Sequence, residues 1–201
     1  MTHFRPLALV FTGAALCATP ATVSAHPHAW VTGQAAVHVA AGKIDRVGMR
    51  WQFDPFFSQV LTGDFDTDGD GSFNADETEA MQNQVFTSLK DYGYFTHVRQ
   101  GEAMIDFDHV ENFSTAVDKG ELIFVFDLIP TAMVDTSAGA IEISVYDPTV
   151  YVDIILGGDK PVTIEGAPPD QCSWQFGSGD GISGQDGGFV TPQTVTLKCG
   201  A

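Results

Sequence analysis

The stretch from Asp66 to Glu77 constrains this chain most, because its polar residues recur at fixed intervals. Carboxylates stand at its first, third and fifth positions, a glycine at its sixth and a glutamate at its twelfth. Calcium takes roughly six to eight oxygen ligands, and this spacing is that of the EF-hand loop, which wraps around the ion. The sequence therefore predicts a calcium site with these ligands: Asp66, Asp68, Asp70, Ser72, Asn74 and Glu77.

Each predicted ligand has its own part in such a loop. Ser72 would give its backbone carbonyl, Asn74 would act directly or through water, and Glu77 would close the site with two oxygens. Gly71 falls where the backbone turns to a positive φ that a side chain opposes, and Phe73 would turn inward as an apolar anchor. The alternative is an acidic, glycine-rich solvated turn, since Asp and Gly are common in turns.

The flanks of this loop have the patterns of helices. Asp54 followed by Pro55 is an N-cap signal, and an apolar stripe then leads into the loop. After the loop, apolar residues recur at three- and four-residue spacing, and Gly93 stands where a helix C-cap belongs. These patterns predict a helix–loop–helix over about residues 54–92, whose second helix ends near Asp91.

The amino terminus predicts a secretory signal peptide. Residues 1–25 combine early basic residues, an apolar run too short to anchor in a bilayer, and the small residues of a cleavage site after Ala25. The mature chain would be a single domain of residues 26–201, periplasmic or secreted. No later stretch has the length of a membrane span, so we expect a protein that does not cross the membrane.

The charge of the mature chain limits its partners. Removal of Arg5 leaves eight basic and 26 acidic residues, a formal charge of −18. A balance this acidic argues against nucleic acid and anionic membrane surfaces, and it favours cations or basic partners.

The two cysteines outside the signal peptide are Cys172 and Cys199. In an oxidising compartment a disulfide is the default, and it would close the segment 172–199. The alternative, a thiolate metal pair, needs further soft ligands that the neighbourhood does not offer.

Most of the mature chain has the pattern of short strands. Residues 30–39 and 44–53 form one predicted hairpin, with Val47, Met49 and Trp51 on one face, and further strands are predicted near 94–99, 103–107, 112–117, 122–129, 141–145, 150–156, 162–164, 173–176 and 194–197. Gly177–Gly188 is predicted to be a loop. We therefore expect an α+β fold, a mainly antiparallel β sandwich-like domain with an inserted EF-hand helix–loop–helix.

Several short motifs together resemble the secreted bacterial family catalogued as domain of unknown function 1007. They are His26-Pro27-His28, Trp51-Gln52-Phe53-Asp54, Phe65 to Gly71, Tyr92 to Thr96, Tyr146 to Thr149, and Glu165 to Pro169. The resemblance implies a periplasmic protein associated with transition-metal transport, through nickel/cobalt exporters or permeases and zinc uptake systems.

The histidines at the predicted mature terminus suggest a second metal site. His26 and His28 offer two imidazoles, which suit zinc, nickel or cobalt, while Pro27 lacks the amide hydrogen that a square-planar terminal site needs. Such a chelate would need further ligands, for which His38, His97 and His109 are candidates. The alternative is a frayed, solvated terminus.

Two function hypotheses follow. The first is a periplasmic calcium-binding accessory protein that binds a transition metal or passes it to a membrane permease or exporter. The second is a calcium-stabilised structural or interaction module with neither a second metal nor catalysis. An enzyme is not expected, because the chain has no glycine-flanked nucleophile, zinc-protease spacing or phosphate loop. Asp147-Pro148-Thr149 follows a strand, and we interpret it as a turn rather than an active site.

Overall fold

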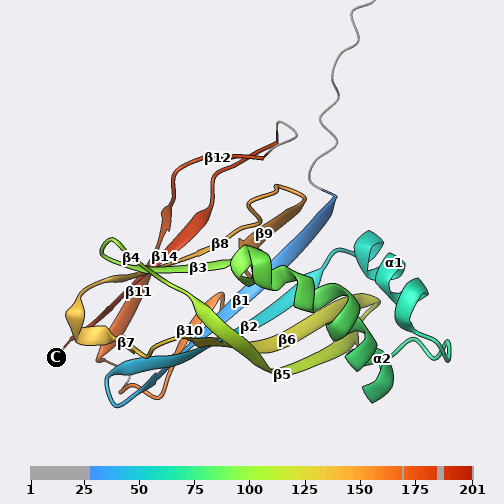
Figure 1. The fold of residues 1–201 in the computed structure, drawn as a ribbon, viewed down its shortest axis with the longest axis horizontal. Helices are drawn as coiled ribbons and strands as arrows, with labels where there is room; N and C mark the ends of the chain where they lie inside the picture. Colours follow the sequence, from blue (N-terminus) through green and yellow to red (C-terminus); the bar gives the residue numbers. More distant parts are fainter. Residues whose placement is uncertain (1–27, 169, 185–187, 201) are drawn as a thin grey trace, which may run out of the picture.

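The computed structural model describes residues 28–168, 170–184 and 188–200. The predicted signal peptide and His26 lie outside these ranges. Two β-sheets enclose one apolar core, to which the larger sheet contributes Trp51 and Phe126 and the smaller sheet Val98, Ile143 and Val195 (Figure 1). This arrangement confirms the predicted α+β, sandwich-like fold.

The larger sheet has the strand order β10-β1-β2-β6-β5, with β7 beside β2 and β9 beside β1. Its strands are β1 (Ala29–Ala40), β2 (Lys43–Phe53), β5 (Phe107–Asp118), β6 (Glu121–Pro130), β7 (Val134–Asp135), β9 (Val152–Leu156) and β10 (Val162–Glu165). Its strands pair antiparallel, except that β9 and β10 both run parallel to β1. The predicted hairpins β1–β2 and β5–β6 are therefore present.

The smaller sheet has the order β11-β14-β8-β3-β4. Its strands are β3 (Thr96–Gln100), β4 (Ala103–Ile105), β8 (Ile141–Val145), β11 (Cys172–Ser178) and β14 (Gln193–Cys199); a 3₁₀ turn, η3, covers Thr136–Ala138. The segment predicted as a plain loop after Gly177 instead contains β12 (Ile182–Ser183), which pairs with β13 (Phe189–Val190). Two-residue strands of this kind carry too little periodicity to be found from sequence.

Alternation along the central strands explains the core. Val47, Met49, Trp51 and Phe53 of β2 are all buried, as their shared face predicts.

The predicted disulfide between Cys172 and Cys199 is also confirmed, and it joins residues directly opposite each other on β11 and β14.

Helix α1 (Pro55–Phe65) begins where the sequence predicts. The Asp54 carboxylate accepts hydrogen bonds from the backbone amides of Phe56 and Phe57, and its other oxygen accepts one from the amide of Trp30. Within the helix, the buried Ser58 hydroxyl accepts a hydrogen bond of 2.9 Å from the Leu122 amide of β6. One polar link therefore fixes α1 to the larger sheet.

The segment after the acidic loop differs from the predicted single helix. It consists of α2 (Ala75–Met81), a π-helical turn η1 (Gln82–Phe86) and a 3₁₀ segment η2 (Thr87–Phe95). Met81 and Phe86 are both buried and stand five residues apart, which is the spacing of a π turn. The predicted C-cap Gly93 has φ +61°, yet Tyr94 and Phe95 also have positive φ before β3 starts. The burial of Phe86 in the core thus takes precedence over the regular α-helical spacing of the apolar residues in this segment.

None of the helices among the described residues has the length and apolar character needed to span a bilayer. The helical segment lies along one side of the larger sheet, where α1 and α2 flank the acidic loop at the right of the view (Figure 1).

Candidate metal centre

The three aspartates at odd positions of the loop come together. One carboxylate oxygen from each of Asp66, Asp68 and Asp70 lies within 4.8 Å of the other two. Asp66 is half-buried, while Asp68 and Asp70 are exposed. This set of hard anionic oxygens suits a hard divalent cation such as calcium.

Asp66 shapes the loop as well as offering a ligand. Its Oδ1 accepts hydrogen bonds from the backbone amides of Gly69 and Asp70, and its Oδ2 accepts one of 2.9 Å from the amide of Gly71. Gly71 has φ +81°, so a side chain there would be strained. The sequence predicted this role for Gly71.

The remaining short-range contacts tighten the same turn. The Asp70 carboxylate accepts a hydrogen bond of 2.7 Å from the Ser72 amide, and the Asn74 side-chain amide donates one of 3.3 Å to Asp68. The Asn74 oxygen meanwhile accepts from the amides of Asp76 and Glu77, which makes Asn74 the N-cap of α2.

Glu77 is placed differently from the aspartates. It is 3% exposed, and its carboxylate turns back to the loop. Oε1 accepts hydrogen bonds of 2.7 Å from both the amide and the hydroxyl of Thr67. Oε2 accepts a hydrogen bond of 3.0 Å from the amide of Asn74. With Asn74 it forms a capping box. The Thr67 hydroxyl, followed by the Asn74 amide, holds the pKa of Glu77 below its usual range.

The predicted ligand set is thus only partly assembled. The structure brings Asp66, Asp68 and Asp70 together, with Asn74 at their edge through Asp68. Glu77 is outside that cluster and would have to exchange its backbone partners for an ion. Sequence spacing could not predict this, because the N3 position of a capping box and the twelfth position of an EF-hand loop are here the same residue.

No second loop with this spacing lies in the described chain, and the helices beside the acidic loop contact the larger sheet instead. The hydroxyls of Thr78 on α2 and Thr115 on β5 lie 2.6 Å apart and share a hydrogen bond. Together with the link from Ser58 to Leu122, this contact ties both flanking helices to neighbouring strands β5 and β6.

The histidines considered as transition-metal ligands do not converge in the described residues. His28 directly precedes β1 and His38 lies near the far end of that strand, roughly 33 Å away at the usual rise per residue. The ring of His28 lies 4.8 Å from that of Tyr151. His38 Nδ1 lies 2.6 Å from Asp45 on the neighbouring strand β2. His38 is therefore too far away to act as a further ligand beside His28, and the prediction that His26 and His28 bind a transition metal stays a prediction, because His26 lies outside the described residues.

His97 is held on the smaller sheet. Its ring stacks on Tyr146 with centroids 4.0 Å apart, and a ring nitrogen lies 3.4 Å from the Tyr146 carbonyl. Burial lowers the pKa of His97, partly offset by that carbonyl contact. A neutral, stacked imidazole of this kind is a packing residue.

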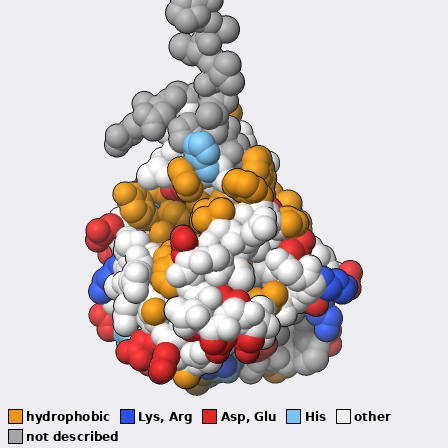
Figure 2. Space-filling view, turned by 90° about the vertical axis from the view of Figure 1, so that its right-hand side faces the viewer, with side chains coloured by type: hydrophobic (Ala, Val, Ile, Leu, Met, Phe, Trp, Pro, Cys, Tyr) orange, Lys and Arg blue, Asp and Glu red, His pale blue; other side chains and the backbone are white. Residues whose placement is uncertain are grey.

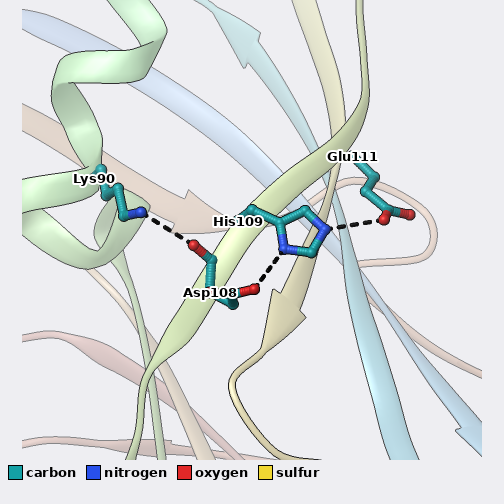
Figure 3. Close-up of polar contacts among 4 residues, drawn as sticks. All are labelled: Lys90, Asp108, His109 and Glu111. Atoms are coloured by element: carbon teal, nitrogen blue, oxygen red, sulfur yellow. Dashed lines mark hydrogen bonds and ion pairs between the residues drawn. The ribbon is translucent and has the colours of Figure 1, made fainter.

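His109 on β5 lies between two carboxylates, as Figure 3 shows. Asp108 is 3.0 Å from its Nδ1 and Glu111 is 2.9 Å from its Nε2, while Lys90 donates to the backbone carbonyl of Asp108. The Glu111 and Asp108 carboxylates raise the pKa of His109. The two acids occupy opposite ring nitrogens, so they form an ion-paired group rather than a chelate. This group was not predicted, although Asp108, His109 and Glu111 lie within four consecutive residues.

The Asp147 turn is confirmed. The Val150 amide donates to the Asp147 carbonyl at 3.0 Å, closing the turn, and the buried Asp147 carboxylate accepts from Thr149, Tyr151 and Val152.

The fold and this site define a disulfide-linked β sandwich with an acidic loop carried by two helices on its larger sheet. The chain belongs to the family described as "Protein of unknown function (DUF1007)", whose model matches residues 11–181. The expected family assignment is thereby confirmed.

A relative from Spirochaeta aurantia is similar to part of the chain. It is described as "Uncharacterized 15.5 kDa protein in trpE 3'region" and is 26% identical over 102 residues, which cover 51% of this chain and 72% of that protein. The printed description of this relative states no activity.

Proposed function

We propose that this chain is a calcium-binding protein of an extracytoplasmic compartment, in which the ion fixes α1 and α2 on the larger sheet. The observation that carries the proposal is the approach of Asp66, Asp68 and Asp70 to within 4.8 Å in a loop of complete EF-hand spacing. The disulfide between Cys172 and Cys199 is compatible with an oxidising compartment.

The loop would work by exchange of partners. Three aspartates supply the first carboxylates, and Glu77 leaves the amides of Thr67 and Asn74 to add two further oxygens. Binding neutralises close negative charges, whose mutual repulsion opposes the compact loop when no cation is present. Calcium therefore acts on the position of α2, and through Thr78 on its contact with β5.

Replacement of Asp70 by Ala tests this role, because it removes a proposed ligand together with its charge. Asp70 is exposed, and the Ser72 amide that it accepts from lies at an exposed position where water can replace the carboxylate. At about 10 mM calcium and a Kd on the order of 10⁻⁴–10⁻³ M, binding should stabilise the parent by roughly 1.4–2.7 kcal/mol, or about 3–10 °C in Tm. Asp70→Ala should lose most of that gain and stay close to the parent in chelator.

The matched control is Asp64→Ala, which removes an exposed charge two residues before the loop. It should keep the calcium-dependent gain in Tm. A parent Tm that is the same in calcium and in chelator would rule out the stabilising role.

The accessory role in transition-metal transport is a second proposal, and the family resemblance supports it. In it, His26 and His28 bind zinc, nickel or cobalt and pass the metal to a membrane permease or exporter. Titration of zinc or nickel into the mature chain and into His26→Ala/His28→Ala tests it, and equal affinity in both would remove it. Because the described histidines lie apart, we favour the calcium-stabilised module over the transition-metal accessory role.

A further inference from the structure

Strand β11 forms one edge of the smaller sheet, because β14 lies on one side of it and no described strand lies on the other (Figure 1). Its seven residues include no charged side chain and no proline, and its pairing with β14 runs without a bulge. Native proteins usually protect a strand edge with charges, bulges or short length, since an open edge can pair with another chain. β11 has none of these protections.

The other outer strands of the two sheets are protected. β5 carries Asp108, Glu111 and Asp118 and has two shifts of register against β6. β4 and β7 have only three and two residues. β9 and β10 have five and four residues, and each includes an acid, Asp153 in β9 and Glu165 in β10. Among the described strands of these sheets, β11 is therefore the long, uncharged edge.

The hydrogen bonds just beyond the two ends of β11 show which of its backbone groups face outward. At one end the Gly200 amide donates to the Gln171 carbonyl. At the other end the Gly179 amide donates to the Pro192 carbonyl. In the register of this pair, the odd-numbered residues of β11 therefore bond to β14, and the amides and carbonyls of the even-numbered residues point away from it. The even-numbered residues are Cys172, Trp174, Phe176 and Ser178.

Two aromatic side chains lie on one face of this edge. Trp174 is half-buried against the core, and Phe176 is 42% exposed, with the two ring centroids 5.0 Å apart. Gln175 is exposed and points to the opposite face of the sheet. β11 thus offers a partner strand its backbone groups and an aromatic contact, and it has no charge that would select a charged partner.

We propose that two copies of this chain pair through β11, antiparallel about a two-fold axis at Gln175, and so join their smaller sheets into one. In this register Trp174 lies opposite Phe176 of the second copy, and Cys172 lies opposite Ser178 of the second copy. Every outward backbone group of the strand then has a partner, and the two aromatic residues form cross-strand pairs. A two-fold axis requires only that the strand complements itself, which an uncharged strand does without repulsion. The pairing does not rest on calcium binding.

Charge limits where else two copies can meet. At each end of the paired strands Asp180 would approach Asp170 of the second copy, so the pairing should not extend beyond β11 and should strengthen with salt. A competing surface lies on the face that carries the helices, where Figure 2 shows hydrophobic side chains gathered in the upper half. Association through that face would leave the outward amides of β11 exposed to solvent, so hydrogen exchange distinguishes the two surfaces.

Sedimentation equilibrium and amide hydrogen exchange of the mature, disulfide-linked chain test the proposal together. As the protein concentration rises, the mass should double, and the amides of Trp174 and Phe176 should become protected from exchange. The amides of Gln175 and Gly177 bond to β14 and should be protected at every concentration. A mass that stays that of one chain up to millimolar concentration would overturn the proposal. So would a dimer in which the amides of Trp174 and Phe176 still exchange freely.

Charge variants at the axis test the register. Gln175→Lys places two like charges opposite each other and should weaken dimerisation about fivefold or more. Gln175→Glu should weaken it likewise, while a mixture of the two variants should form a heterodimer tighter than either homodimer. Ser114→Lys makes the same change of net charge at an exposed position on the edge strand β5, and it should dimerise like the parent. A Gln175→Lys variant that dimerises as tightly as the parent, or a mixture without preference for the heterodimer, would contradict this register. Circular dichroism establishes that each variant is folded.

Discussion

In the proposed calcium site, one carboxylate of Glu77 would serve two purposes. In the structure it caps α2 and accepts from the amides of Thr67 and Asn74, and calcium binding would need the same oxygens. The loop therefore has a defined state without the ion, and calcium would compete with these hydrogen bonds. This competition is one physical reason to expect weak affinity.

Replacement of Glu77 by Gln should consequently lower the Tm in chelator as well as in calcium. Gln keeps one acceptor oxygen and loses the other, so the backbone amide of either Asn74 or Thr67 loses its partner. The decrease should be larger in calcium, where bidentate binding is lost too. Glu79→Gln, at an exposed position on α2, is the control, and thermal denaturation by circular dichroism measures both. A variant with the parent's Tm in chelator would contradict the capping role.

Two histidines should give pH dependences of opposite sign. Burial lowers the pKa of His97, so the imidazole binds a proton more readily in the unfolded chain than in the folded chain. The stability of the fold should therefore fall as the pH drops through about 6.5, the ordinary histidine pKa. The raised pKa of His109 stabilises the fold below the ordinary histidine pKa, and this contribution is lost as the pH rises through the folded pKa.

The pair of variants His97→Gln and His109→Gln checks these signs. Urea unfolding between pH 5 and 8 should show a shallower acid-side loss of stability for His97→Gln than for the parent. For His109→Gln the stability gained toward low pH should shrink. Identical pH profiles for the parent and both variants would contradict the two assignments.

At the scale of elements, the polar link between α1 and β6 depends on Ser58. Its hydroxyl is fully buried and is the acceptor for the Leu122 amide. Ser58→Ala leaves that amide unsatisfied and should cost roughly 1–3 kcal/mol of unfolding free energy. Ser173→Ala, at an exposed position on β11, should change stability by less than about 0.5 kcal/mol. Chemical denaturation measures both, and equal losses would show that the link contributes nothing.

Which elements were predictable follows from the strength of their local signals. The alternation of apolar and polar residues in β2 and the Asp54-Pro55 start of α1 are signals that lie within a few consecutive residues. Both predicted their elements correctly. The break after Met81 was not predictable, because it depends on Phe86 meeting Phe113, Phe126 and Trp51 from other strands. The π turn is a tertiary effect that the helical period of the sequence hides.

At the scale of the whole molecule, sequence could predict a sandwich but not which strands adjoin. The parallel pairing of β9 and β10 with β1 brings Tyr151 beside His28, and the same fold separates His28 from His38. The described histidines therefore add no further ligand to the predicted site at His26 and His28. The approach of Asp66, Asp68 and Asp70 was predictable because the three aspartates lie within five consecutive residues.

The whole chain carries a strong excess of acid, part of which is concentrated in the helix–loop–helix on the larger sheet. A cation at this place would reduce the repulsion and connect α1 with α2. In the proposed function, calcium bound at this loop therefore stabilises the fold.

Isothermal titration of calcium into the chelator-treated protein tests this central claim most directly. We expect one ion per chain with a Kd on the order of 10⁻⁴–10⁻³ M, binding at least tenfold weaker in Asp70→Ala, and unchanged binding in Asp64→Ala. Absence of calcium binding at millimolar concentration, or binding that Asp70→Ala leaves intact, would contradict calcium binding at this loop.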